Sequence, residues 1–340
     1  MNIILDAHGG DHAPLEVLKG AALAVKEYGV SVTLCGVEEQ LRALAAEQKI
    51  STDEMSFAPA TQVLPMDADP AEIFGQYAES SMAEGMRLLA AGVGAAFVTA
   101  GNTGAMAMGS SIIVKRLRGI KRAALAVVIP NARGCHLLLD CGANVECRPE
   151  MLQQFGIMGS AYMEKVMGLS SPRLGVVNIG TEEGKGLSLQ IEAGRMLRAS
   201  ELNFIGNIEA RDLPLGGCDV AVCDGFTGNV ALKLTEGMGK WISAEIKRIL
   251  LKNTGTKLAA VLIRDGLQRF KSSMDYTEYG GAPLLGLKYP VIKAHGSSNA
   301  HAFKNAIRQA KLMVETDMIG QIDLALKDLK GQTITGGARQ

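Results

Sequence analysis

Aromatic side chains are scarce in this sequence: Phe, Trp and Tyr together make up 4% of the 340 residues. The apolar residues, 47% of the chain, are therefore mostly aliphatic, which suits closely packed strands and helices. An excess of charge of either sign is also missing, because 35 Lys plus Arg face 35 Asp plus Glu. This balance argues against a nucleic-acid-binding protein, and we expect no nucleic acid among the partners.

Metal-binding and secretion signals are absent from the sequence too. The six cysteines form no CxxC pair and no Cys/His spacing of the kind that zinc sites show. Scattered thiols in a chain of this length favour a reducing cytoplasm. The chain enters an apolar segment without a basic region or cleavage site, so we predict no signal peptide. We likewise predict no metal site and no cofactor.

A charge-free segment, Leu88–Val114, is long enough to cross a bilayer. A Gly-Asn-Thr-Gly turn lies near its centre, and a turn there would leave backbone polar groups unpaired in lipid. We therefore predict a buried strand followed by a helix.

Glycine, by contrast, is abundant, with 40 residues. In Asp219–Leu234 a buried strand is followed by a turn with Gly225 and Gly228 and by a helical pattern from Val230. A helix that begins after such a turn presents unpaired N–H groups and the positive end of its dipole. This segment predicts a phosphate site, with the N–H groups of Gly228 and Asn229 as donors.

The same pattern of strand, glycine turn and helix recurs along the chain. It is found in Asn2–Leu18, Ala95–Gly109 and Leu174–Gln190, and a fifth turn, GSSN at 296–299, precedes a helical pattern. Ligands of open α/β sheets bind beyond the carboxyl ends of the strands, so we expect these turns to converge on one active site.

Strand and helix patterns alternate throughout, which predicts an α/β fold: a doubly wound, mostly parallel sheet with helices on both faces. No linker marks a boundary, so we predict a single domain over residues 1–340. A basic amphipathic helical hairpin at residues 247–271 is predicted to protrude from it. This pattern suits an anionic bilayer or an acidic partner, and equally a subunit interface.

Familiar catalytic motifs fit poorly. The segment Gly180–Gly186 lacks the Ser or Thr that follows the lysine of a P-loop, and neither a dinucleotide fingerprint nor a GxSxG elbow is present. Cys141 is a candidate acyl-accepting thiol, although a buried small side chain is favoured. The histidines and aspartates of the segment 6–12 favour capping roles over metal binding.

Seven ordered motifs resemble those of a known family. They are DAHGGDHAP (6–14), TAGNTGA (99–105), LLDCGAN (138–144), NIGTEEGKG (178–186), GNIEARDL (206–213), CDGFTGNVALK (223–233) and GAPLLGL through AHGSSNA (281–300). The chain resembles the bacterial phosphate acyltransferases of phospholipid synthesis nearly end to end. That family usually has methionine where this chain has His8. The resemblance implies the fold of phosphotransacetylases and isopropylmalate dehydrogenases.

The resemblance also implies an activity and partners. The reaction would transfer a fatty acyl group from acyl-[acyl-carrier-protein] to inorganic phosphate and yield acyl phosphate. The chain would be a cytoplasmic homodimer, attached peripherally to the anionic inner face of the cell membrane. Its partners would be the acyl carrier protein and a downstream glycerol-phosphate acyltransferase that uses acyl phosphate. Docking to membrane or carrier is expected at Lys257, Leu258, Val261, Leu262, Arg264 and Phe270.

We predict that bound phosphate attacks the thioester directly, without a covalent enzyme intermediate. The predicted catalytic residues are Lys185, Asn229, His295 and Asn102. The predicted phosphate- and acyl-binding residues are Asp6, Gly9, Gly10, Asp11, Gly101, Thr103, Gly104, Asn144, Gly180, Thr181, Gly184, Asp224, Thr227, Gly228, Ser297 and Ser298. Two alternatives stay open: a nicotinamide-dependent dehydrogenase of the same fold, and a non-catalytic sensor of phosphate or acyl ligands.

Overall fold

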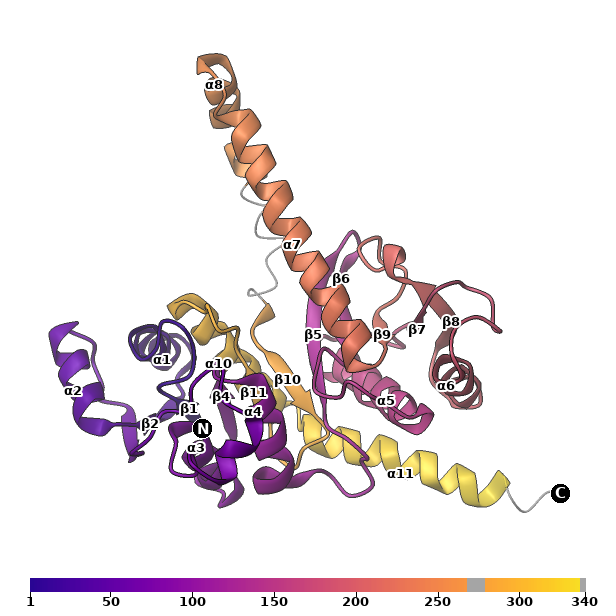
Figure 1. Cartoon of the computed structure of the whole chain (residues 1–340), viewed down its shortest axis with the longest axis horizontal. Helices are drawn as coiled ribbons and strands as arrows, with labels where there is room; N and C mark the ends of the chain where they lie inside the picture. Colours follow the sequence, from indigo (N-terminus) through magenta and orange to yellow (C-terminus); the bar gives the residue numbers. More distant parts are fainter. Residues whose placement is uncertain (268–278, 337–340) are drawn as a thin grey trace.

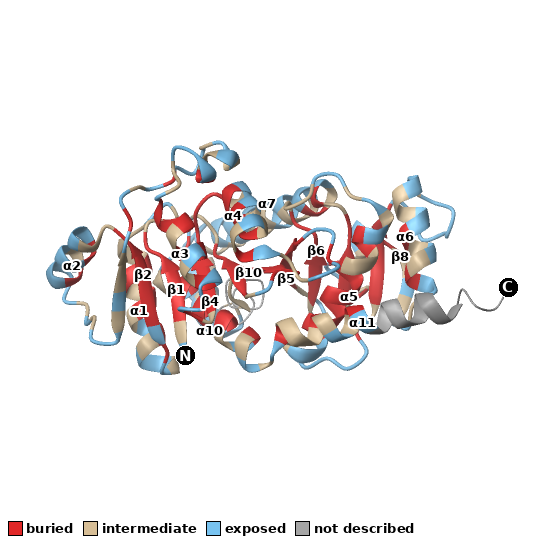
Figure 2. Ribbon diagram, turned by 90° about the horizontal axis from the view of Figure 1, so that it is seen from below, coloured by how far each residue is buried: buried red, intermediate tan, exposed pale blue. Residues whose placement is uncertain are grey.

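The computed structural model describes residues 1–267 and 279–336, and the described chain is built around one eleven-stranded sheet. The strands are ordered β3-β2-β1-β4-β11-β10-β5-β6-β9-β7-β8. Their bounds are β1 Asn2–Asp6, β2 Ser31–Gly36, β3 Met55–Pro59, β4 Ala96–Thr99, β5 Ala124–Asn131, β6 Gly134–Leu139, β7 Leu174–Asn178, β8 Phe204–Glu209, β9 Val220–Val222, β10 Ala282–Leu285 and β11 Val291–Lys293. The central strands of the sheet are buried, the edge strands β3 and β8 are only partly buried, and helices lie on both faces (Figure 2).

The two halves of the sheet run in opposite directions. Strands β3, β2, β1, β4 and β11 are mutually parallel, as are β6, β9, β7 and β8. Between them, β10 pairs antiparallel with β11 of the first half, β5 pairs antiparallel with β6 of the second half, and β10 and β5 are antiparallel to each other. The sheet is thus mostly parallel, as predicted, but the carboxyl ends of all its strands do not share one edge.

Each face of the sheet has its own apolar core because successive side chains of a strand point to opposite sides. In β1, Ile3 and Leu5 join the core beneath α1, α5 and α10, whereas Ile4 joins the core beneath α3 and α4. Small residues allow close contacts in this arrangement: Gly85 lets α3 approach Phe97, and Gly94, in the turn before β4, lies close to Ile4.

Several helices begin at residues with side-chain capping chemistry. Asn102, Asp224 and Asn299 each accept a backbone N–H three residues further on, at the starts of α4, α7 and α10. The α-helices are α1 Leu15–Tyr28, α2 Glu38–Glu47, α3 Ser81–Ala90, α4 Thr103–Gly109, α5 Pro149–Lys165, α6 Ser188–Arg198, α7 Gly225–Leu250, α8 Thr254–Leu262, α10 Ala300–Glu315 and α11 Met318–Gly336. Short 3₁₀ helices cover Pro70–Phe74 and Ala210–Asp212, and a π-helix covers Ser110–Lys115.

Helix α7 leaves the body of the molecule as a long arm, with α8 folded back at its tip (Figure 1). Only Gly225 and Gly228, in its first turn, are buried. The predicted hairpin is therefore present in outline. The sequence pattern of the hairpin indicates a second helix from Lys257 to Lys271, but α8 ends at Leu262, and Phe270 lies outside the described residues.

Two further differences concern the start of one helix and the presence of two short strands. The sequence pattern placed the start of the long helix at Val230, but α7 begins at Gly225. The two short strands β10 and β11 were not predicted, although they join the halves of the sheet. Each has only three or four residues, too few for a periodic pattern to stand out.

No helix in the described ranges has the length and apolar character to cross a bilayer.

Candidate active site

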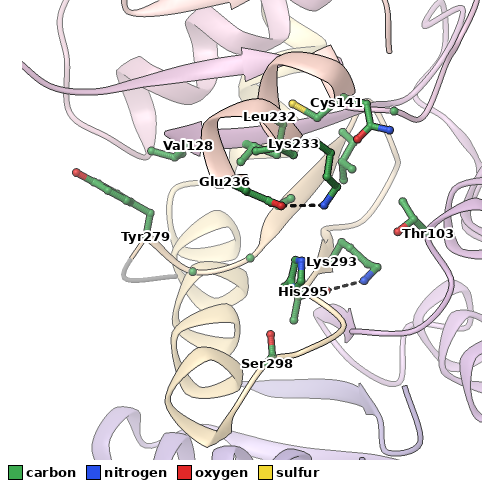
Figure 3. Close-up of a pocket in the computed structure, with 18 of the residues that line it drawn as sticks. Thr103, Val128, Cys141, Leu232, Lys233, Glu236, Tyr279, Lys293, His295 and Ser298 are labelled. Atoms are coloured by element: carbon green, nitrogen blue, oxygen red, sulfur yellow. Dashed lines mark hydrogen bonds and ion pairs between the residues drawn. The ribbon is translucent and has the colours of Figure 1, made fainter. Parts of the chain in front are cut away.

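A cavity of about 320 Å³ opens over the central strands, where the two halves of the sheet meet. Two β5 side chains, Leu125 and Val127, lie on one of its walls. Figure 3 shows Val128, Leu232 and Tyr279 at one end of the cavity. Lys293, His295 and Thr103 lie at the other end. The cavity therefore combines an apolar end with a polar end, and both open into the same space.

Lys293, the last residue of β11, provides a buried positive charge at the polar end. Its side chain is only 8% exposed, and its Nζ donates to the backbone oxygens of Ala100 at 3.0 Å and Ala294 at 2.6 Å. Burial lowers its pKa from 10.5 to about 8, with the carboxylates of Asp6 and Asp11 acting in the opposite direction. The ammonium form therefore prevails at neutral pH.

The other lysine of the cavity already has a partner. Lys233 of α7 forms an ion pair with Glu236, one helical turn further on, at 2.9 Å. Within the described part of the chain, no carboxylate forms an ion pair with Lys293. Lys293 therefore differs from Lys233 in having no anionic neighbour in contact.

His295 follows β11 by two residues and faces the same space. Its Nδ1 accepts the backbone N–H of Ser297 at 3.2 Å and lies 2.8 Å from the Ser297 hydroxyl. An accepting Nδ1 places the ring proton on Nε2. Burial lowers the pKa of His295 below its ordinary value of 6.5, so the imidazole is neutral at pH 7. A neutral imidazole with a proton on Nε2 is a hydrogen-bond donor.

Two of the helix starts that the sequence analysis assigned to anion binding, those of α7 and α10, have N–H groups that are satisfied from within the protein. At α7, Asp224 accepts the Thr227 N–H and the Asn144 carbonyl accepts that of Gly225. Gly228 N–H, predicted to bind phosphate, donates to the Asp224 carbonyl at 3.0 Å. That prediction was wrong because the helix begins five residues earlier than the pattern indicated.

The turn before α10 is likewise occupied. The Glu16 carboxylate accepts the Ala300 N–H at 2.7 Å, and Asn299 accepts that of Ala302 at 3.0 Å. A carboxylate from α1 therefore takes the place that the sequence analysis gave to a bound anion. The start of α4 differs, because Thr103 and Gly104 of its first turn line the cavity.

Asn229 lies on the cavity side of α7, next to Gly142 in the loop that follows β6. A Cβ on Gly142 would lie 3.7 Å from the Asn229 side chain, and Gly142 has a φ of +119° that favours glycine. The Asn229 amide has no hydrogen-bond partner among the described residues. Its donors and acceptor are therefore available to a ligand.

The thiol of Cys141 also lines the cavity, but burial raises its pKa well above 9. Its Sγ donates to the Leu138 carbonyl at 3.3 Å. Since the thiolate is the nucleophilic form, this cysteine is a poor acyl acceptor. The geometry agrees with the predicted preference for a buried, unreactive side chain.

Comparison with known proteins finds relatives that match this chain over nearly its whole length. The profile of a family described as "Fatty acid synthesis protein" matches residues 1–321. The Phosphate acyltransferase of Thermoanaerobacter pseudethanolicus is 46% identical over 323 residues, which cover 95% of this chain and 96% of the relative. That of Thermoanaerobacterium thermosaccharolyticum is 45% identical over 322 residues, with the same coverage. The chain belongs to the phosphate acyltransferase family.

Solved structures resembling this phosphate acyltransferase family member share its fold at low sequence identity. A phosphotransacetylase from Streptococcus pyogenes superposes with a TM-score of 0.64 and 15% identity, covering 93% of this chain and 94% of that one. A branched-chain phosphotransacylase from Enterococcus faecalis gives 0.58 and 14%, covering 92% and 99%. A 4-hydroxythreonine-4-phosphate dehydrogenase from Klebsiella pneumoniae gives 0.55 and 13%, with the same coverage. The predicted doubly wound fold is confirmed.

Some of the predicted site residues line the cavity, and others support it from beneath. Asp6 belongs to the second group: its carboxylate accepts the hydroxyls of Ser81 at 2.6 Å and Thr99 at 2.7 Å. Asn102 donates to the carbonyls of Met66 and Ala68 while it caps α4. The predicted residues that line the cavity are Asn229, His295, Thr103, Gly104 and Ser298. Those in the loops beside it are Gly9, Gly10, Asp11, Gly101, Asn144, Asp224 and Ser297, and Thr227 and Gly228 lie in the first turn of α7.

The loop after β7 does not line this cavity. It holds Lys185, Gly180, Thr181 and Gly184, and the Lys185 side chain is exposed to solvent. The Lys185 carbonyl accepts the Asn178 side-chain amide at 2.9 Å, which shapes the loop. The segments that follow β6 and β9 contribute Cys141 and Asn229 to the cavity, but β7 lies one strand further from the centre of the sheet.

Sequence reasoning missed Lys293 in this phosphate acyltransferase. Lys293 directly follows the apolar pair Val291 and Ile292, and Ala294 comes after it. The signal that could have identified it is a charged residue at the end of an apolar run, shortly before a Gly-Ser-Ser turn. Across the described residues, no group of three or more His, Cys, Asp or Glu is placed to hold a metal ion.

Proposed function

We propose that this chain transfers a fatty acyl group from an acyl carrier protein to inorganic phosphate and produces acyl phosphate. The observation that favours this function most is one cavity with an apolar end at Leu232 and Val128 and a cationic end at Lys293. An acyl chain binds to apolar surface and a phosphate ion binds to positive charge, and such a cavity provides both. Family membership supports the same reaction.

In this mechanism hydrogen phosphate is the nucleophile. One phosphate oxygen forms a bond to the thioester carbonyl carbon, the carbon–sulfur bond breaks, and the phosphate proton ends on the departing thiolate. Products are acyl phosphate and the free carrier thiol, so atoms and charge balance. Holding the two reactants together supplies much of the rate, since effective molarities for oriented groups reach roughly 10⁵ to 10⁸ M.

The tetrahedral intermediate has a negatively charged oxygen that needs donors. We assign this role to the Nε2–H of His295 and to the side-chain amide of Asn229, which both face the cavity. Loss of one such donor typically lowers the rate by about 10² to 10³. The raised pKa of Cys141 supports direct attack by phosphate over an acyl-enzyme intermediate.

The arm formed by α7 and α8 is proposed to dock at the anionic inner face of the cell membrane, where the product is consumed. Its tip exposes the apolar residues Leu258, Val261 and Leu262, which are 64%, 71% and 85% accessible. Lys257 and Arg264 are exposed beside them. An apolar tip with basic neighbours suits an anionic bilayer surface. A glycerol-phosphate acyltransferase that uses acyl phosphate would act next.

The test is release of free carrier thiol from palmitoyl-carrier protein, followed with a thiol reagent as phosphate is varied. We expect release to depend on phosphate and on enzyme, with an equal amount of acyl phosphate trapped by hydroxylamine. Replacing the carrier by coenzyme A distinguishes this activity from that of a phosphotransacetylase. Phosphate-independent release, or phosphate binding without release, contradicts the proposal, and the second result would favour a sensor.

A further inference from the structure

Lys293 presents a buried positive charge for which the described protein offers no anionic contact. Of its three N–H donors, two are used by the carbonyls of Ala100 and Ala294. Figure 3 shows the ammonium group at the edge of the cavity, between His295 and Thr103. A buried charge without a partner is costly, and an anion that enters the cavity removes that cost.

Several other sources of attraction for an anion near the cavity are already engaged. Lys233 is paired with Glu236 at 2.9 Å. The start of α7 is capped by Asp224, and the start of α10 is covered by the Glu16 carboxylate. Lys185, the cation expected from sequence, lies on an exposed loop that does not line the cavity. Lys293 is therefore the positive charge best placed to meet phosphate.

We infer that Lys293 binds the phosphate substrate in its protonated form and holds it against the thioester, in the reaction proposed above, on which this assignment rests. Its position at the end of β11 places the phosphate next to His295, which faces the developing oxyanion. The two carbonyl acceptors fix the direction of the ammonium group before the substrate enters, so little side-chain entropy is lost on binding.

The charge of Lys293 makes phosphate binding depend on pH. Phosphate binding needs the ammonium form, whose pKa in the free protein is about 8. The charged groups that face it are Asp6 and Asp11 from the β1 side and the Lys233–Glu236 pair from α7. Burial lowers the pKa of His295 below 6.5 and raises those of Cys141 and Tyr279, so none of these three changes charge between pH 7 and 9.

The first experiment uses unaltered protein. We expect the KM for phosphate, expressed as the concentration of the hydrogen phosphate dianion, to rise about tenfold between pH 7 and pH 9, with little change in kcat, because one proton on Lys293 is required for binding. In Lys293→Arg the charge persists to higher pH, so the KM should stay nearly constant over this range. A phosphate KM that is independent of pH in the unaltered enzyme overturns the inference.

The second experiment compares Lys293→Met with Lys288→Met, which removes an exposed lysine five residues earlier. We expect Lys293→Met to raise the KM for phosphate about ten- to hundredfold, the usual value of a hydrogen bond to a charged group. Lys288→Met should leave it unchanged. A normal phosphate KM in Lys293→Met contradicts the inference, as does a raised KM in Lys185→Met alone.

A binding measurement separates this inference from the proposed reaction. Inorganic phosphate at saturation should raise the melting temperature of the unaltered protein by about 2–4 °C and leave that of Lys293→Met nearly unchanged. This result supports phosphate binding at Lys293 even if no acyl transfer is detected. Acyl transfer with equal phosphate stabilisation of both proteins would uphold the function and refute the role of Lys293.

Discussion

At the scale of single residues, the first turn of α7 shows how closely the two halves of the site are packed. A Cβ on Gly228 would lie 1.9 Å from the backbone oxygen of Asp140, and one on Gly225 would lie 2.6 Å from that of Asn144. Backbone atoms cannot move aside as a flexible side chain can. These glycines therefore allow the helix that carries Asn229 to approach the end of β6.

Gly228→Ala tests this close approach. We expect it to lower the free energy of unfolding by about 2–4 kcal/mol, because the added methyl group forces helix and strand apart. Gly237→Ala, on the same helix with no atom within 4 Å of the added Cβ, is the matched control. It should raise stability by about 0.5–1 kcal/mol. Denaturant unfolding of both variants gives the comparison, and equal stabilities would refute the steric argument.

Buried His136 on β6 predicts how stability depends on pH. Burial lowers its pKa to about 4, and its Nε2 has no partner among the described residues. Between pH 6.5 and 4 the unfolded chain binds a proton here that the folded chain does not, so stability falls as the pH falls. Proton binding by this histidine in the unfolded chain should lower the free energy of unfolding by about 2 kcal/mol between pH 7 and pH 5.

The measurement is chemical denaturation of the unaltered protein and of His136→Gln at both pH values. Gln keeps an acceptor for the Asn131 amide, which lies 3.2 Å from His136 Nδ1, but does not titrate in this range. The variant should lose about 2 kcal/mol less than the unaltered protein on acidification. An identical loss in both proteins would show that other groups control acid stability.

At the scale of elements, the arm of α7 and α8 is unusual because so little of it is covered. Apart from the first turn of α7, the described part of the arm has no buried residue, and it projects from the body (Figure 1). Packing usually provides most of the stability of a helix in a protein. An arm with this much free apolar surface is suited to contact something outside the chain.

The tip of the arm is tested by altering its apolar and basic residues separately. Leu262→Asp should abolish sedimentation with vesicles of anionic lipid, because it places a charge where apolar contact is needed. Lys257→Glu with Arg264→Glu should weaken binding to anionic vesicles and leave weak binding to neutral vesicles unchanged. If both variants bind like the unaltered protein, the membrane is contacted elsewhere or the tip docks the carrier protein.

At the scale of the whole molecule, α7 also carries an exposed apolar stripe along its length. Residues four or three apart in a helix share a face. The stripe consists of Phe226, Val230, Leu234, Met238 and Trp241, which are between 45% and 64% exposed. Large apolar residues gathered on one face indicate an interaction surface. A second copy of the chain fits the homodimer expected from the family resemblance.

Leu234→Glu tests the stripe as a subunit interface. We expect it to shift the protein from dimer to monomer in light scattering coupled to gel filtration, since two charges would be buried against each other. Thr235→Glu introduces the same charge on the next residue, which faces away from the stripe, and should leave the mass unchanged. Equal masses for both variants would place the subunit contact on another surface.

Much of this architecture was predictable from local pattern. The apolar periodicity of the sequence predicts helices that begin at about Leu15, Glu38 and Pro149, and α1, α2 and α5 begin at these residues, because the periodic apolar residues of each lie close together in sequence. The candidate site was predictable in part: His295 and Asn229 follow strands or glycine turns and do line the cavity. Lys293 was not found, because its position beside β4 depends on the pairing of β11 with a strand far away in sequence.

The amino-acid sequence by itself determined the alternation of strands and helices, the family and the set of polar turns from which a site is made. Only the tertiary structure decided which turns meet and which of them remain open to a ligand. The Ala300 N–H was available in the local pattern, but Glu16, 284 residues away, occupies it. Local patterns report neighbours along the chain, whereas burial, pairing and electrostatic compensation depend on residues that only folding brings together.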